Sequence, residues 1–211
     1  MNFLKKITVQ QKVFGGFGLV LILLLVVAFI GVFSLRSADE NFARYRQIAL
    51  QSLQAGRVQA NLLEARLAVF EYMKNASPDA AEQVRKRLKS THEYNVELAG
   101  ILIEPARLTV AKDSSDAIKA YDQNFAKLVG TSDAVEREQI FKEKLSVIGP
   151  KVADDMEQLK LDIKSEQDAL GPRAEAAIGN AVFLVSIISV AALIAGVVAA
   201  WIVGTGISRP I

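Results

Sequence analysis

The sequence predicts an all-α protein in which two transmembrane helices flank an up-down-up-down four-helix bundle outside the cytoplasm. Two long runs, 13–35 and 176–208, contain no charged residue and are strongly apolar. Each exceeds the roughly 20 residues that a helix needs to cross a bilayer. The segment between them is rich in Ala, Leu, Glu, Gln, Lys and Arg, which favour helix, and it shows no strand-like alternation of apolar and polar residues.

These boundaries divide the chain into five parts. The first apolar run is too long for the hydrophobic core of a secretory signal, which is about 7–15 residues. It also ends in Phe33-Ser34-Leu35-Arg36, which lacks the small residues of a cleavage site. We therefore expect an uncleaved anchor. The parts are a cytoplasmic N-terminus (1–12), a first span (13–35), the bundle (36–175), a second span (176–206) and a final segment (207–211).

The placement of charge predicts the orientation. Lys5, Lys6 and Lys12 precede the first span, Arg209 follows the second, and all 23 acidic residues lie in 36–175. Because basic residues favour the cytoplasmic side, both termini are expected inside and the bundle outside. The net charge of +2 therefore reflects topology, and we expect no nucleic-acid partner, which would need a basic patch on the soluble part.

Helix breakers divide the bundle segment into four pieces of similar length, as in an up-down-up-down bundle. Ser77-Pro78-Asp79 should end the first helix and cap the second, which should end before Pro105. We expect the third helix to start at 113–116, to kink at 130–133 and to end before Gly149-Pro150. The fourth should start at Pro150, and Gly171-Pro172 should interrupt it by bending or loosening the helix.

Two apolar columns run along the first bundle helix. One repeats at alternating steps of four and three, like the seam of a coiled coil: Ala49, Leu53, Gly56, Ala60, Leu63, Leu67 and Phe70. The other repeats every seven residues: Ile48, Ala55, Leu62 and Val69. The pattern fits either one broad core face or a core face plus a dimer seam.

The whole layout resembles bacterial methyl-accepting chemotaxis receptors with a four-helix-bundle sensor domain. The resemblance rests on the span-bundle-span order, on the segment 56–66 (GRVQANLLEAR) and on the final residues ISRPI, which look like the opening of a HAMP linker. It implies a homodimer in the bacterial inner membrane with a periplasmic sensor domain for a small ligand. It also implies a cytoplasmic kinase and adaptor as partners. The sensor half of a transmembrane histidine kinase or nucleotide cyclase is the alternative, since these share the same input layout.

Arginines on the first bundle helix are the candidate ligand contacts, because a guanidinium grips a carboxylate in bidentate fashion. The resemblance implies such a role for Arg66, and Arg57 lies on the same helix. The next expected arginine falls at Glu71. The ligand could therefore be an amino acid, an amine or an organic acid. Lys151 is the nearest match to a polar contact on the fourth helix. The alternative for Arg57, Arg66 and Lys151 is a solvated helix face.

Other residues carry weaker signals. His92 is the only histidine and there are no cysteines, so we expect no metal site and no cofactor. No nucleophile-and-base arrangement is present, and the chain is not expected to be an enzyme. Trp201 lies near the inner end of the second span, where indole favours the interface. Ala192, Gly196 and Ala200 form a small-residue face that permits close helix contact.

Overall fold

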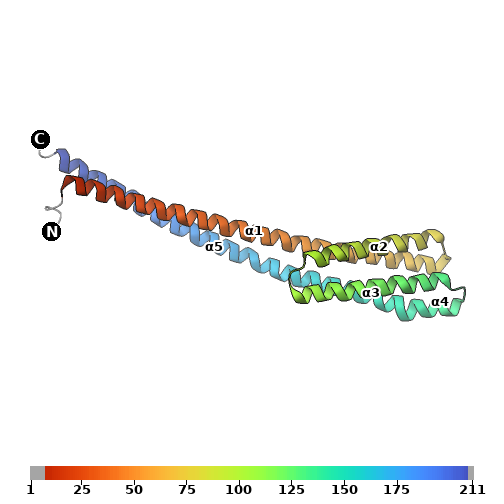
Figure 1. The fold of residues 1–211 in the computed structure, drawn as a ribbon. Helices are drawn as coiled ribbons and strands as arrows, with labels where there is room; N and C mark the ends of the chain where they lie inside the picture. Colours follow the sequence, from red (N-terminus) through yellow and green to blue (C-terminus); the bar gives the residue numbers. More distant parts are fainter. Residues whose placement is uncertain (1–7, 209–211) are drawn as a thin grey trace. The chain divides into compact units, whose positions relative to one another are not determined.

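The computed structural model describes residues 8–208. Figure 1 shows that this part of the chain is helical. It divides into two compact units. Residues 44–169 form one, called here the bundle unit. The residues up to 43, together with those from 170 onward, form the other, the apolar unit. The elements are α1 (Val9–Asn75), α2 (Pro78–Ile101), α3 (Pro105–Gly130), α4 (Ala134–Ile140), a π-helical turn (Phe141–Leu145) and α5 (Ser146–Ser208).

The bundle unit consists of four helical segments, as predicted. Its helices bury positions at alternating steps of three and four, the spacing of coiled-coil packing. On α1 the buried column is Ile48, Gln51, Ala55, Val58, Leu62, Ala65, Val69 and Tyr72. On α2 and α3, large side chains such as Leu88, Leu98, Ile118 and Phe125 are also buried. Tyr72 packs edge-on against Phe125, with ring centroids 5.7 Å apart.

The two apolar columns of α1 face different surroundings. Ile48, Ala55, Leu62 and Val69 belong to the buried core. The column from Ala49 to Phe70 is largely exposed: Leu67 is 68% and Phe70 54% accessible, Leu53 and Leu63 are also exposed, and only Ala49 and Gly56 are half-buried. Val58 and Leu67 are nine residues apart, which places them on opposite sides of a helix. Within the bundle unit, α1 therefore has a core face and an opposite apolar face that the described chain leaves uncovered.

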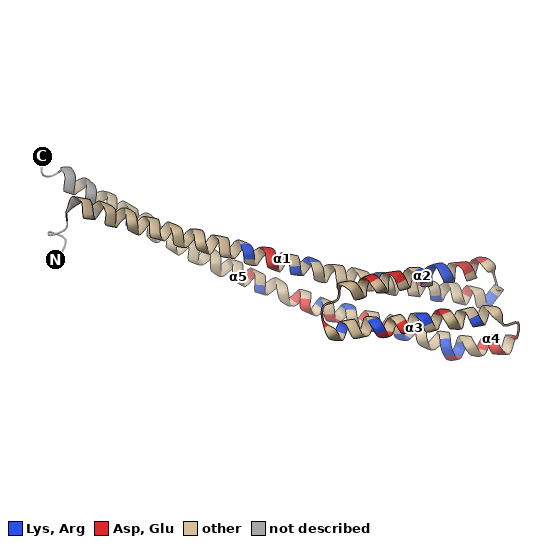
Figure 2. Ribbon diagram, viewed as in Figure 1, with Lys and Arg blue, Asp and Glu red and all other residues tan. Residues whose placement is uncertain are grey.

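The connection between α1 and α2 follows the prediction. Ser77 is the N-cap of α2, its hydroxyl accepts a bond from the Ala80 amide, and Pro78 occupies the first turn. Ala76, at the end of α1, has a φ of 49°, the left-handed conformation that often terminates a helix. Figure 2 shows acidic and basic residues along α2 and α3 and along the bundle parts of α1 and α5.

The predicted start of the third helix at 113–116 is wrong. Helix α3 begins at Pro105, and Ser114 is fully buried within it. Glu104 is extended, with a ψ of 123°, as expected of a residue before proline. The connection after α2 therefore ends at Glu104, and α3 begins at Pro105. The chain reverses next at 131–133, where a kink was expected, and Asp133 caps α4 through the Val135 amide.

The predicted break at Gly149-Pro150 is also wrong, because α5 runs through it. The helix is likewise continuous at Gly171-Pro172, where the sequence predicts a bend or a loosening. Pro150 lies five residues after Leu145, the last residue of the π turn. Ser146, whose carbonyl would meet the proline ring, has a ψ of −10° and is already displaced from regular α geometry. Pro172 removes one amide donor from a 63-residue helix, which weakens a long helix without ending it.

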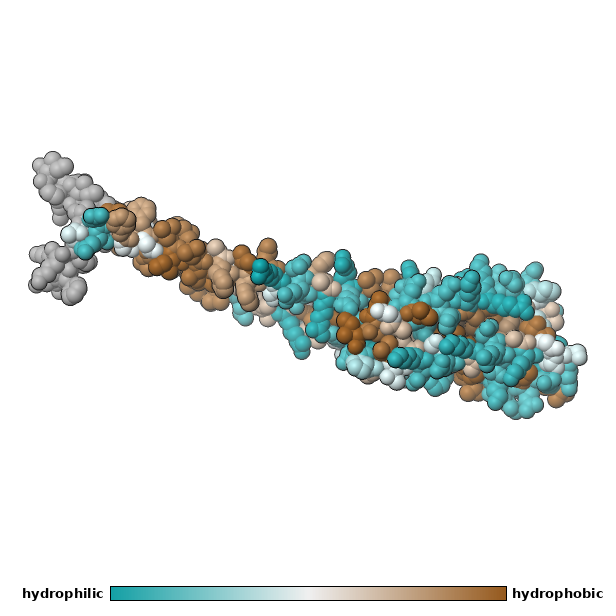
Figure 3. Space-filling view, viewed as in Figure 1, coloured by the Kyte–Doolittle hydropathy of each residue, from teal (hydrophilic) through white to brown (hydrophobic). Residues whose placement is uncertain are grey.

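In the apolar unit, α1 and α5 each contain a stretch long and apolar enough to cross a membrane by length and composition. None of the residues in the most apolar window of either stretch is buried. Figure 3 shows hydrophobic side chains over much of this unit's visible surface. Gly16 and Ala199 approach closely, since a Cβ added at Gly16 would lie 2.8 Å from the Ala199 Cβ. Gly196, in the small-residue face, lies next to Val20.

Candidate functional site

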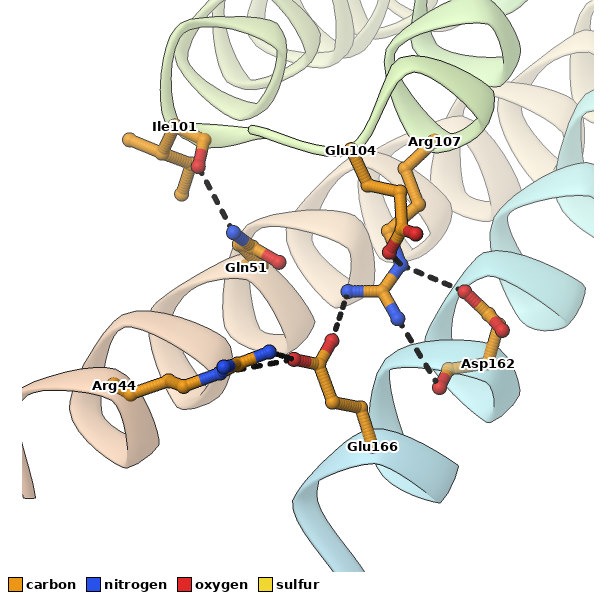
Figure 4. Close-up of polar contacts among 7 residues, drawn as sticks. All are labelled: Arg44, Gln51, Ile101, Glu104, Arg107, Asp162 and Glu166. Carbon is orange, nitrogen blue, oxygen red and sulfur yellow. Dashed lines mark hydrogen bonds and ion pairs between the residues drawn. The ribbon is translucent and has the colours of Figure 1, made fainter. Parts of the chain in front are cut away.

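A buried arginine links the start of α3 to α5 in the bundle unit (Figure 4). Arg107, on the first turn of α3, is only 7% accessible. Its Nε donates to an Asp162 carboxylate oxygen at 2.6 Å, and one of its terminal nitrogens donates to Glu166 at 2.7 Å. Glu104, just before α3, lies 3.7 Å away. Arg107 therefore links the start of α3 to α5 through hydrogen bonds between charged groups, which are the strong ones in proteins.

Glu166 extends this cluster to α1. Its other oxygen accepts bonds from Arg44 at 2.6 and 3.2 Å. Hydrogen bonds from Arg44 and then from Arg107 hold the pKa of Glu166 below its ordinary value, against the opposing effect of burial. Nearby, the Gln51 amide donates to the Ile101 carbonyl at the end of α2. Together these contacts, the Arg107 cluster, bind the α2–α3 turn to both α1 and α5.

The aliphatic stem of Arg66 packs into a narrow slot beside Gly149. A Cβ added at Gly149 would lie 2.9 Å from the Arg66 Cδ and 3.0 Å from the Tyr121 ring. A side chain at position 149 would therefore displace Arg66 or Tyr121, which explains a glycine inside α5. Burial raises the pKa of Tyr121, while the Arg66 charge opposes that rise. No ion pair or hydrogen bond of the Arg66 guanidinium is present among residues 8–208, so its charge remains available.

Arg57 faces a different neighbour. Its guanidinium lies 5.3 Å from the centre of the Tyr94 ring on α2, within the range of a cation–π contact. Nine residues separate Arg57 from Arg66, so the two side chains leave α1 on opposite sides. The structure of a single chain therefore does not bring these two candidate arginines together.

The remaining candidates are dispersed. Glu71 is exposed near the end of α1. Lys151 is exposed within α5, beyond its first turn rather than at a helix start, and it pairs with Asp155 at 2.6 Å. That pair raises the pKa of Lys151. Trp201 is 70% accessible on the apolar unit. Lys5, Lys6 and Arg209 lie outside the described residues. Within residues 8–208, no cluster of three or more metal-binding side chains occurs.

Sequence reasoning missed Arg107, Asp162 and Glu166. A signal was present, since Arg107 continues the buried column Ala111, Ser114, Ile118, Tyr121, Phe125 and Leu128 at steps of four and three. A charged residue at a core position must find a partner, and α5 offers two acids one helical turn apart. The prediction failed because the third helix was expected to start after Arg107.

The described residues define an all-α sensor-type bundle whose first and last helices also carry long apolar stretches. Residues 6–159 match a family model described as a four helix bundle sensory module for signal transduction. The chain therefore belongs to this family of sensory modules. No curated protein and no solved structure matches the chain significantly.

Proposed function

We propose that this chain is the sensing and membrane-anchoring region of a methyl-accepting chemotaxis receptor in the bacterial inner membrane. The observation that carries the proposal is that α1 and α5 each contain one helix of the sensory bundle and one uncovered apolar stretch. Side chains such as Phe17, Phe29 and Leu193 are strongly exposed, and a lipid bilayer removes them from water. The chain transmits the signal of ligand binding from the bundle to a HAMP and kinase-control module.

Both termini lie in the cytoplasm and residues 36–175 in the periplasm under this proposal. The support is the cluster of Lys5, Lys6 and Lys12 before the first span and the confinement of all acids to the bundle segment. Alkaline phosphatase fused at about residue 110 should be active, and phosphatase fused at residue 211 inactive. The reverse activities would contradict this topology.

A second copy of the chain covers the uncovered apolar face of α1 under this proposal. That face follows coiled-coil spacing and lies opposite the helix's own core, and Gly56 within it leaves space for close approach because a Cβ there would meet nothing. The chain contains no cysteine, so single cysteines can map the contact. Leu63→Cys should crosslink between chains in membranes, while Arg85→Cys on α2 should not. Crosslinking at position 85 alone would place the interface elsewhere.

The ligand, an amino acid, amine or organic acid, binds beside this seam with Arg66 as the anchor for a carboxylate. On the helix, Leu63 and Phe70 are the neighbours of Arg66 at three and four residues, and its guanidinium has no partner among the described residues. Losing a hydrogen bond to a charged group costs about 1.5–3 kcal/mol, or about tenfold to a hundredfold in affinity.

The binding test starts with a thermal-shift screen of small metabolites on the full chain in dodecyl maltoside. Calorimetry with a hit should then show at least about tenfold weaker binding to Arg66→Ala. Arg57→Ala is the matched variant, because the Arg57 guanidinium rests on Tyr94 away from Arg66. It should bind nearly as well as the parent. Dissociation constants unchanged in both variants would place the site elsewhere.

A further inference from the structure

A groove lies between α2 and α3, and neither Arg66 nor Arg57 lines it. Its volume is about 500 Å³ and it is open to solvent, a size within the range of small-molecule sites. Leu88, Ile118 and Phe125 form its apolar floor, and Ala126 lies at its edge. The α2–α3 face appears in Figure 3 as hydrophilic side chains interspersed with hydrophobic ones.

The rim of the groove is predominantly basic. Arg85 and Lys89 line it from α2 and Lys119 from α3, against a single acid, Asp122. The three cations have only long ion pairs with neighbours on their own helices, at 4.0, 3.9 and 3.6 Å. By contrast, Arg107 and Asp162 are 2.6 Å apart. These cations therefore have N–H groups available to donate hydrogen bonds. Because all three side chains are positively charged, they favour an anion.

His92 adds a polar group to the wall of the groove. It lines the groove, and its Nδ1 is buried with no hydrogen-bond partner among the described residues. A buried polar atom without a partner costs stability, so a ligand that supplies a partner gains affinity. Because the ring lines the groove, rotation about its Cβ–Cγ bond changes which nitrogen faces the space.

We propose that this groove is a binding site for a small amphiphilic anion, with a single negatively charged head group and an apolar body. The head group lies among Arg85, Lys89 and Lys119, within reach of the His92 imidazole. The body covers Leu88, Ile118 and Phe125. The site is separate from the proposed dimer seam, because α2 and α3 line it and α1 does not.

The single histidine provides a direct readout. We would label the full chain with ¹³Cε1-histidine, purify it without a histidine tag in dodecyl maltoside, and titrate 3-phenylpropionate by NMR. The His92 resonance should shift saturably. 3-Phenylpropylamine, of similar size but opposite charge, and propionate, without the ring, should each have much smaller effects. Absence of a saturable shift with 3-phenylpropionate would overturn the proposal, as would equal shifts with the amine.

Two variants test the site itself. Arg85→Gln with Lys89→Gln should weaken binding by about tenfold, since each exposed ion pair contributes modestly. Lys86→Gln with Lys112→Gln removes the same charge from positions outside the groove and should bind like the parent. Ala126→Leu keeps every charge but fills the groove, and it should abolish the shift. Equal weakening in both double variants, or unaltered binding to Ala126→Leu, would mean that the anion binds nonspecifically to the surface, and the proposal would be wrong.

Discussion

Arg107 and Arg66 belong to the same bundle unit, but the protein surrounds them in opposite ways. Arg107 is buried and its guanidinium is shared among Asp162, Glu166 and Glu104. For Arg66, the stem is packed against Gly149 and the Tyr121 ring, while its charge has no partner among residues 8–208. The contrast indicates that the Arg107 charge holds helices together, whereas Arg66 is positioned by packing of its stem. Under the proposed function, the Arg66 charge is the part of the side chain that binds the ligand.

Replacing Arg107 by Met should have the largest effect on stability. Met keeps most of the stem volume but leaves Asp162 without its cation and Glu166 with Arg44 alone. We expect a loss of about 1.5–3 kcal/mol in the free energy of unfolding. This is below the range for fully buried pairs because Asp162 is largely exposed. All four tyrosines lie in the bundle unit, so near-ultraviolet circular dichroism of tyrosine follows its unfolding in urea. A change below about 0.5 kcal/mol would contradict a structural role for the cluster.

The main features of the fold follow from short-range patterns in the sequence. The apolar runs, the Ser77 cap and the two columns on α1 all depend on residues close in sequence, and they predicted the bundle. Whether the two columns form one broad face or two faces stayed open until the structure separated them. The break predicted at Gly149-Pro150 is absent, because whether a glycine or proline ends a helix depends on its tertiary surroundings. Gly149 leaves space for Arg66, which lies more than 80 positions earlier.

The candidate site was predictable only in part. Arg66 was identified from its local context, but its separation from Arg57 depends on helix phase and on the neighbours that α2, α3 and α5 provide. The Arg107 cluster joins residues 55 and 59 positions apart. Such pairings require the register between helices, and composition and periodicity do not specify that register.

Gly149→Ala tests whether packing holds Arg66 in place. At an open helical position, Gly→Ala stabilises by about 0.5–1 kcal/mol, and Gly100→Ala on α2 should do so because a Cβ there meets nothing. At Gly149 the new methyl group would collide with Arg66 and Tyr121, so we expect a loss of about 1–2 kcal/mol. Equal stabilisation of both variants in urea unfolding would show that the slot is not tight.

Acid should weaken the Arg107 cluster through Glu166. The pKa of Glu166 in the folded chain is below the ordinary value of 4.5, mainly because Arg44 donates to it. Its stabilising effect is therefore fully present above about pH 4.5 and is lost as the pH falls through the folded pKa. Glu166→Gln should be less stable than the parent by about 1 kcal/mol at pH 7, and this difference should shrink towards pH 3.

Urea unfolding at pH 7, 5, 4 and 3 measures this trend. Glu71→Gln is the matched control, because Glu71 makes no described hydrogen bond or ion pair, and its difference from the parent should stay near zero throughout. A difference between Glu166→Gln and the parent that grows as the pH falls would reverse the expected sign and exclude Glu166 as a stabilising acceptor.

Arg66→Met should have the smallest effect, and it completes the comparison because the same substitution is made at Arg107. Met preserves the aliphatic atoms that pack on Gly149 and Tyr121, and removal of the guanidinium breaks no described contact. We therefore expect a change within about 0.5 kcal/mol in the free energy of unfolding. Arg66→Ala also removes the stem and should cost more, since it leaves a gap beside the Tyr121 ring. If Arg66→Met instead destabilised the bundle as much as Arg107→Met, the Arg66 charge would have a structural partner, and it would no longer be the free anchor that ligand binding at the seam requires.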